Sequence, residues 1–307
     1  MTEVTVYQNQ VSEVNAFISS NLKSICDAQP CKENTRTKYF KDMVEFNEWL
    51  TGKEFSIDTV MKYRNDYLTK RTNIGTGTKN LKLAALRTLV KELYFRGIIP
   101  IDITGKLKNF NTETKHKSGL DIGEVQRVKA YIQGLTDEKK RVRLNAMFSL
   151  LTLQGFRQFE VCNILVGDFN PTDGKNGTVK ILGKGKSEKD RIDLHQDTTK
   201  AVKEYLRMTG KKSGYLFTSE KGTTKGERLT ERGFRKIFDS VFGELDIDRS
   251  THGFRHFFVT TMLEATNGNI GVVKEFSRHK STAALVMYDD RRKKVEHNEI
   301  FYKAFDF

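Results

Sequence analysis

The sequence HGFRHFFVTTM, residues 252–262, places two histidines and an arginine within five positions, ahead of an apolar run. Three interpretations fit this stretch taken alone: a metal site, a buried core helix, or part of a site that grips a phosphate group. His252 and His256 are four residues apart, so they share one face if the stretch is helical. The rest of the chain has to decide between the three interpretations.

A metal site is the weakest of the three. Zinc-binding helices of the HExxH type carry a glutamate directly after the first histidine, and Gly253 stands at that position. No third ligand is close in sequence, and Arg255 would repel a cation. A structural pair of histidines stays open at this point. The remaining interpretation is an anion site, because Arg255 presents a planar fork of donors and His252 adds another donor three residues away.

The charge of the chain favours a polyanionic partner. The 307 residues include 53 Lys and Arg against 39 Asp and Glu, which gives a net charge of +14. The basic residues are spread along the whole chain, so we expect a folded protein that wraps an extended polyanion and neutralises phosphates at many points. A soluble basic protein without such a partner is the alternative.

The chain is expected to lie in the cytoplasm. No stretch approaches the roughly 20 apolar residues of a membrane span. The N-terminal MTEVTVYQNQ lacks the basic and apolar regions of a secretory signal. Cys26, Cys31 and Cys162 lack metal-ligand spacing and are expected to be buried or free thiols. We therefore expect neither a bound metal nor a cofactor.

Residues 1–105 are predicted to form a helical bundle. Apolar residues recur every three or four positions from Glu33 to Leu50, which indicates an amphipathic helix. A second helix is predicted from Ser56, its expected N-cap, to Lys70, and a third from residue 75 to Gly97. The polar, basic residues 106–119 then predict a linker, with an ordinary surface loop as the alternative.

Residues 120–307 are predicted to form a second domain of mixed structure. Periodicity indicates helices in residues 121–135 and 138–155. The segment GTVKILGKGKSEKDRIDL, residues 177–194, alternates around a turn rich in Gly and Lys, which predicts a β-hairpin with a basic tip. Helical patterns return afterwards. The predicted fold class is mainly α with two domains, the second carrying a small antiparallel sheet.

Isolated basic residues in apolar surroundings supply further candidates for a phosphate site. Arg157 follows Gly155 inside an apolar stretch, where a buried guanidinium needs a partner, and Glu160 lies within helical reach. A local salt bridge with no further role is the alternative. His279 and, nine residues later, Tyr288 follow near the end. A tyrosine is a useful nucleophile where cationic donors surround the phosphate that it attacks.

Taken together, these segments resemble the tyrosine recombinase, or phage integrase, family, of the simple core-site type similar to Xer and Cre recombinases. The likeness runs from about Thr35 to the C-terminus. GFRQFEV resembles the first arginine motif, G-x-R-x-x-E, and HGFRH resembles the H-x-x-R motif. Each motif is weak alone, but the ordered set is specific. The matching residues are Arg157, Glu160, His252, Arg255, His279 and Tyr288.

Two segments depart from the family pattern. The hairpin is similar to the family's G-K-G-x-K-x-R type and points to Lys184, but its turn holds one residue more, so Lys186 is the alternative. Before His279 the family usually has Leu-Gly, whereas this chain has Ser277 and Arg278. This second departure is expected to change the packing of the turn and to leave His279 in place.

The resemblance implies a division of labour at a DNA phosphodiester. The nucleophile would be Tyr288, which forms a 3′-phosphotyrosyl bond. The two arginines would hold the non-bridging oxygens, and the lysine would protonate the leaving 5′-oxygen. His252 would assist proton transfer at the tyrosine, His279 would donate to the phosphate, and Glu160 would orient the arginine side. His256 is expected to be structural.

The resemblance also implies partners. These are double-stranded DNA with inverted-repeat core sites and, in the synapse, a homotetramer. Each protomer would dock its C-terminal segment, about residues 291–307, on a neighbour, with a terminal helix folded on its own domain as the alternative. The function implied is site-specific recombination, for integration, excision or resolution of DNA. Alternative functions are a type IB topoisomerase-like DNA-relaxing enzyme and a catalytically silent DNA-binding protein.

Overall fold

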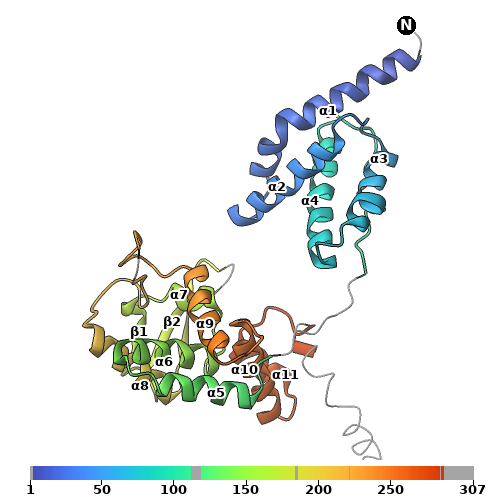
Figure 1. The fold of residues 1–307 in the computed structure, drawn as a ribbon. Coiled ribbons are helices and arrows are strands. Elements are labelled where there is room, and N and C mark those ends of the chain that lie inside the picture. The colour runs from blue at the N-terminus through green and yellow to red at the C-terminus, as the bar shows by residue number, and fades with distance from the viewer. Residues whose placement is uncertain (1–2, 112–118, 184–185, 221, 284, 287–307) are drawn as a thin grey trace, which may run out of the picture. The chain divides into compact units, whose positions relative to one another are not determined.

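The computed structural model describes residues 3–111, 119–183, 186–220, 222–283 and 285–286. The chain divides into two compact units, residues 1–116 and 117–307. Figure 1 labels their helices and strands. Among the helices that the structure describes, none is long and apolar enough to cross a membrane.

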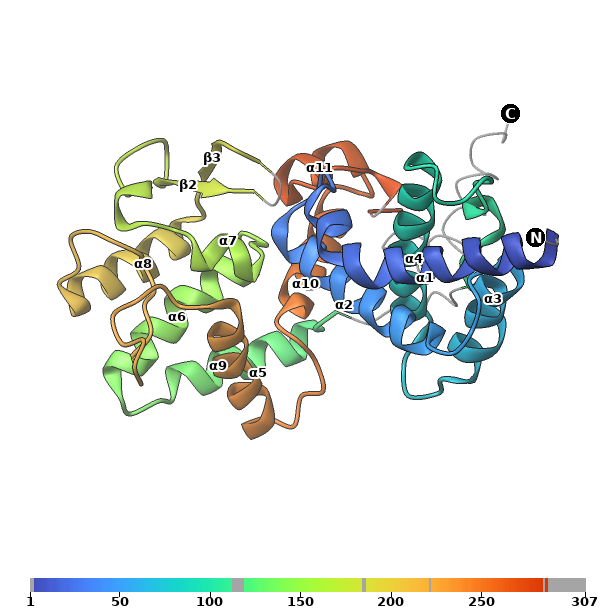
Figure 2. The ribbon, with the colours of Figure 1, turned by 90° about the horizontal axis from the view of Figure 1, so that it is seen from above.

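The N-terminal unit is a bundle of helices. Figures 1 and 2 show α1 and α4 packed against α2, with the α3 segment beside α4. Ser56 caps α3 by accepting a hydrogen bond from the amide of Thr59 at 3.1 Å, as predicted. The helices are α1 Glu3–Asp27, α2 Glu33–Leu50, α3 Ile57–Lys62, a π-helical turn Tyr63–Leu68, and α4 Thr76–Phe95.

The first residues of the predicted linker belong to the N-terminal unit. Leu107 is buried in the core of this bundle. The Asn80 side chain donates to the carbonyl of Phe110 at 3.0 Å and accepts from its amide at 2.8 Å. A short 3₁₀ turn, Thr104–Lys106, precedes these contacts. The bundle therefore continues past residue 105, where the sequence pattern placed its end.

The C-terminal unit surrounds helix α6 with other helices and one small sheet. Helix α6, Glu138–Thr152, contacts α5, α7, α8 and α10. Its side chains from Ala146 to Thr152 are all buried, as expected for a helix covered on every side. The other helices of this unit are α5 Ile122–Gln133, α7 Gln158–Cys162, α8 Gln196–Thr209, α9 Glu231–Glu244, α10 His252–Ala265 and α11 Ile270–Ser277.

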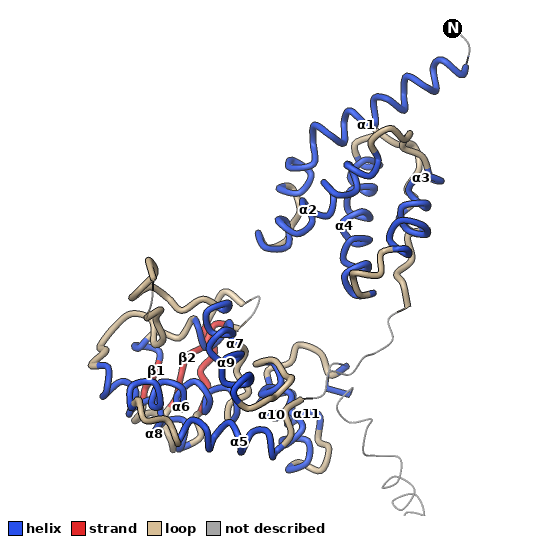
Figure 3. The backbone as a smooth tube through the Cα atoms, in the orientation of Figure 1, coloured by secondary structure: helices blue, strands red, loops and turns tan. Residues whose placement is uncertain are grey.

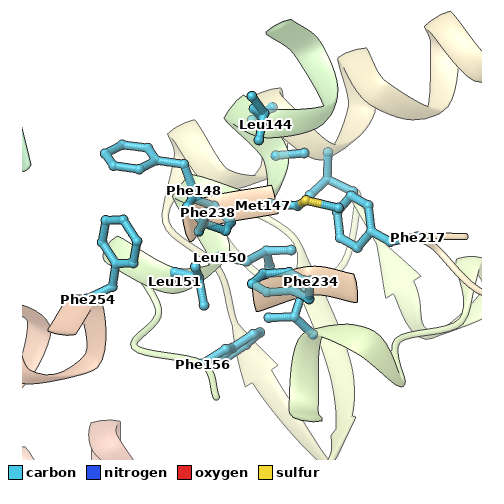
Figure 4. Close-up of a cluster of buried hydrophobic side chains, with 14 of the residues drawn as sticks. Leu144, Met147, Phe148, Leu150, Leu151, Phe156, Phe217, Phe234, Phe238 and Phe254 are labelled. Atoms are coloured by element: carbon cyan, nitrogen blue, oxygen red, sulfur yellow. The ribbon is translucent and has the colours of Figure 1, made fainter. Parts of the chain in front are cut away.

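Aromatic side chains fill the core around α6. Figure 4 shows leucines, Met147 and Phe148 of α6 facing Phe234 and Phe238 of α9. The ring of Phe254, from α10, packs against Phe238 with centroids 5.4 Å apart. This contact holds the helix that carries the HGFRH motif on the core.

The sheet has three antiparallel strands in the order β1-β2-β3. The strands are drawn in red in Figure 3: β1 Phe169–Asn170, β2 Thr178–Leu182 and β3 Lys189–Asp193. The register pairs Thr178 with Asp193 and Leu182 with Lys189, which is the predicted hairpin. The predicted fold class, mainly α with a small antiparallel sheet, is confirmed.

Candidate active site

A tight turn places the first arginine. Gly155 has a φ of +58°, a backbone conformation that glycine adopts easily, and Phe156 beside it is buried in the core. Arg157 then stands at the N-cap of α7. Glu160, only 1% exposed, accepts from the backbone amide and the Nη1 of Arg157, both at 2.8 Å. The turn and the buried carboxylate therefore fix the direction of the Arg157 guanidinium.

The second arginine lies inside the unit. Arg255, on α10, is 1% exposed, and its Nη1 donates to the carbonyl of Gly155 at 2.6 Å. Its Nη2 donates to the carbonyl of Ser277 and lies 3.4 Å from Nε2 of His279. Two main-chain carbonyls from different segments therefore aim this guanidinium. The contact with Gly155 also joins α10 to the turn that carries Arg157.

The two histidines of HGFRH contact each other. The rings of His252, which is exposed, and His256, which is half-buried, meet edge to face with centroids 4.9 Å apart. Gly119, near the start of the C-terminal unit, packs directly against α10 at His256. A Cβ added at Gly119 would lie 2.6 Å from the Cβ of His256. The amide of Leu120 donates to the carbonyl of Gly253 at 3.3 Å. No group of three His, Cys, Asp or Glu that could hold a metal occurs among the described residues.

His279 lies beside the arginines, at the end of α11. Its Nδ1 is 2.7 Å from the Oγ of Ser277. Burial, and then the positive charges of Arg255 and Arg157, lower the pKa of His279 from 6.5 to about 4. The imidazole is therefore neutral at neutral pH and has one N–H to donate.

Sequence reasoning missed one member of this cluster. Arg278 is C-terminal to α11, and its Nη2 lies 3.2 Å from the Oε2 of Glu160. Burial would raise the pKa of the Glu160 carboxyl, but Arg278, the Arg157 amide and two more guanidiniums outweigh burial and lower it. Glu160 is thus an ionised carboxylate shared by two arginines. The sequence showed Arg278 as a departure from the family motif, but it did not show that Arg278 contacts Glu160.

Of the two candidate lysines, the structure describes Lys186 but not Lys184. Lys184 and Tyr288 lie outside the described residues. Lys186 is on the hairpin, and its Nζ lies 2.7 Å from both carboxylate oxygens of Asp190. Its side chain is 50% exposed. The geometry of the nucleophile relative to the arginines therefore stays a prediction.

Comparison with known proteins gives the family. The model of the phage integrase family matches residues 121–294. Tyrosine recombinase slr0733 of Synechocystis sp. is 29% identical over 280 residues, covering 84% of this chain and 87% of that protein. XerC of Leptospira interrogans is 25% identical over 283 residues, covering 89% of this chain and 87% of that one.

Solved structures show the same fold. A XerH site-specific recombinase bound to its difH substrate matches with a TM-score of 0.66 and 16% identity, covering 95% of each chain. A lambda integrase dimer bound to a core site matches with a TM-score of 0.69 and 15% identity, covering 91% of this chain and 77% of that one. Because the family model spans more than half of the sequence, the chain belongs to the phage integrase family, the tyrosine recombinases.

Proposed function

We propose that this protein is a site-specific DNA recombinase that cuts and rejoins DNA through a 3′-phosphotyrosyl intermediate. The observation that carries the proposal is the gathering of three donors from separate segments. Arg157 binds the buried carboxylate of Glu160, Arg255 donates to the carbonyl of Gly155 two residues before Arg157, and His279 contacts Arg255. Guanidiniums fixed in direction suit the two non-bridging oxygens of a phosphodiester, because each presents paired donors. The family and its recombinase relatives support the same reaction.

In the proposed reaction the Oη of Tyr288 attacks the phosphorus and the bond from phosphorus to the 5′-oxygen breaks. His252 assists removal of the tyrosine proton, and Lys184 protonates the leaving 5′-oxygen. The arginines and His279 stabilise the negative charge that develops on the non-bridging oxygens, and each such donor is worth about 10²- to 10³-fold in rate. The phosphotyrosyl bond conserves the energy of the phosphodiester, so a 5′-hydroxyl of the partner strand can rejoin the DNA and release the tyrosine.

We favour Lys184 over Lys186 as the general acid. Asp190 binds the Nζ of Lys186 through both oxygens at 2.7 Å, four residues along the same hairpin. This ion pair holds the Lys186 ammonium on the hairpin, so it would have to break before Lys186 could reach a 5′-oxygen. Exchanging each lysine for methionine separates the two: the general acid is the one whose loss is rescued by a 5′-phosphorothiolate substrate, whose sulfur leaves without a proton.

DNA and further copies of the chain are the proposed partners. One solved relative is a lambda integrase tetramer bound to a Holliday junction. For this chain we propose binding to inverted-repeat core sites, with the net charge of +14 supplying phosphate contacts. The helical bundle would bind one face of the DNA. The C-terminal segment 291–307, proposed to dock on a neighbouring protomer, lies outside the described residues.

A covalent-adduct assay tests the proposal. A binding site is first selected from a random duplex library with the Tyr288→Phe variant, and nicked versions of it then serve as suicide substrates. We expect a protein–DNA adduct with the wild-type chain and with Tyr215→Phe, an exposed tyrosine of the same unit. No adduct should form with Tyr288→Phe. An adduct that survives Tyr288→Phe, or none with wild type on selected DNA, would refute the proposal.

Recombination is then separated from DNA relaxation with two sites on one supercoiled circle. A recombinase yields products in which the flanking sequences are exchanged. Relaxed circles without exchanged flanks would refute the recombinase assignment and support a relaxing enzyme.

A further inference from the structure

The turn that follows α11 contacts Arg255 and the carboxylate of Glu160, which holds Arg157. The carbonyl of Ser277 accepts from the Nη2 of Arg255, and the Oγ of Ser277 contacts the Nδ1 of His279 at 2.7 Å. The residue between them, Arg278, reaches the carboxylate that holds Arg157. Three consecutive residues therefore join the two arginine segments, which are otherwise about a hundred positions apart in the sequence.

The backbone of Arg278 is in an uncommon conformation. Its φ is +56° and its ψ is +39°, in the left-handed region that glycine adopts most easily. A side chain at this position carries a steric cost that glycine would not. The contacts of the Arg278 side chain have to offset this cost.

The side chain of Arg278 is held on several sides. It is 13% exposed, and its guanidinium lies over the ring of Phe156 at 4.7 Å. Nη1 donates to the carbonyl of Phe276 at 2.9 Å, while Nη2 reaches Glu160 at 3.2 Å. Phe156 is the residue directly before Arg157, so Arg278 touches the arginine turn through both a ring and a carboxylate. Its buried Nε has no hydrogen-bond partner among the described residues.

We propose that Arg278 is a positioning residue for strand cleavage: it holds Glu160, and through Glu160 the guanidinium of Arg157, in the direction of the scissile phosphate. The inference rests on the proposed function. Both carboxylate oxygens of Glu160 accept hydrogen bonds in this arrangement. Oε1 accepts from the Nη1 of Arg157, and Oε2 accepts from the Arg157 amide and from Arg278. Without Arg278, the buried carboxylate keeps contacts with Arg157 alone and can rotate with it.

The charges in this cluster also support a positioning role for Arg278. Three guanidiniums, those of Arg157, Arg255 and Arg278, act on the one buried carboxylate of Glu160. Arg278 thus neutralises Glu160, which leaves more of the positive charge of Arg157 for an incoming phosphate. Arg278 does not have to contact the phosphate to have this effect on Arg157, because its Nη2 donates to Glu160.

The test uses the full chain and begins with three single variants. Arg278→Gly removes the side chain at a position where glycine suits the backbone, so the variant adds no backbone strain. Far-UV circular dichroism of each variant checks that it is folded. Asn267→Gly is the matched control. Asn267 also has a left-handed backbone, with a φ of +49°, is exposed in the turn that follows α10, and lies outside the cluster. Arg278→Lys keeps the charge and loses the fork. The readouts are the rate of adduct formation on the nicked substrate and the dissociation constant for the uncut duplex.

We expect Arg278→Gly to slow adduct formation by about 10- to 100-fold, the range of a misplaced catalytic group, with the dissociation constant within about twofold of wild type. Arg278→Lys should recover part of the rate, and Asn267→Gly all of it. Because both residues act through one carboxylate, adding Glu160→Gln to Arg278→Gly should slow the reaction less than the product of the two single effects. Wild-type rates in Arg278→Gly, or rate and affinity falling together, would overturn the proposal.

A second readout needs no DNA cleavage, so it also tests the proposal if the proposed function fails. In the chain labelled with ¹⁵N-arginine, the guanidinium N–H signals of Arg157, assigned with Arg157→Lys, report how firmly that group is held. We expect them to be protected from exchange in wild type and Asn267→Gly and to broaden or exchange quickly in Arg278→Gly. Unchanged Arg157 signals in Arg278→Gly would overturn the inference, whatever the cleavage assay gives.

Discussion

Gly155→Ala should destabilise the C-terminal unit and disturb both arginines. A Cβ at this position would lie 2.7 Å from Cγ and 3.0 Å from Cε1 of Phe258, and closer still to Cδ1. Phe258 is 8% exposed and packs with Val259 and Leu263, so its ring has little room to withdraw. The φ of Gly155 is +58°, which strains any residue with a Cβ.

The magnitude has two parts. A left-handed conformation costs an alanine about 1–2 kcal/mol, and the lower entropy of the unfolded alanine chain offsets about 0.4–1 kcal/mol of this. The net backbone cost is thus about 1 kcal/mol. Overlap with a packed ring adds about 1–3 kcal/mol. We therefore expect a loss of about 2–4 kcal/mol in the free energy of unfolding.

Gly210→Ala isolates the backbone part. Gly210 ends α8 in the same unit with a φ of +64°, and a Cβ there would meet nothing within 4 Å. We expect it to lose only about 1 kcal/mol. Urea unfolding followed by far-UV circular dichroism measures both variants, while fluorescence of Trp49, the single tryptophan, reports the N-terminal unit. Equal losses in the two variants would refute the steric argument.

Two further predictions concern pH and the N-terminal core. The pKa of His279 is about 4 in the folded chain and 6.5 in an unperturbed histidine. Between pH 4 and pH 6.5 the unfolded chain therefore binds a proton that the folded chain lacks, and the free energy of unfolding rises with pH. From pH 7 to 5, wild type should lose about 1 kcal/mol more than His279→Asn, after a discount for partial exposure; parallel urea-unfolding curves at both pH values would contradict this. Tyr63→Phe should be neutral or stabilise by about 1 kcal/mol, because the buried hydroxyl has no partner among the described residues. Urea unfolding followed by Trp49 fluorescence measures this change, and a clear loss of stability would refute it.

Local sequence patterns predicted the elements whose stability is local. Helix α2 begins and ends at the predicted residues, and the hairpin pairs the predicted segments, because each has its own apolar period. Helix α1 was not predicted, although Val14, Ile18 and Leu22 recur at helical spacing and are buried. The π-helical turn Tyr63–Leu68 also had no sequence signal: its aromatic rings pack on Trp49, and this tertiary contact is not readable from spacing.

The candidate site was predicted as a set of residues but not as an arrangement. Arg157 and Glu160 are three residues apart, so their contact was within reach of a helical pattern. The contact between Arg278 and Glu160 spans 118 positions, and that between Arg255 and Gly155 spans 100. Such contacts depend on how helices pack, which one sequence does not encode in any local period.

The residues that orient the two site arginines differ from the basic residues that would supply most of the affinity for DNA. Arg255 is aimed by the main-chain carbonyls of Gly155 and Ser277, and Arg157 by the carboxylate of Glu160, which Arg278 also contacts. Carbonyl acceptors orient the Arg255 guanidinium without neutralising it, so its charge remains for the phosphate. For Arg157, the contact of Arg278 with Glu160 offsets the charge of the carboxylate. Substitutions in the turns that supply these contacts should therefore change the rate of cleavage far more than the affinity for DNA, whose salt-dependent part comes from lysines and arginines spread over the chain.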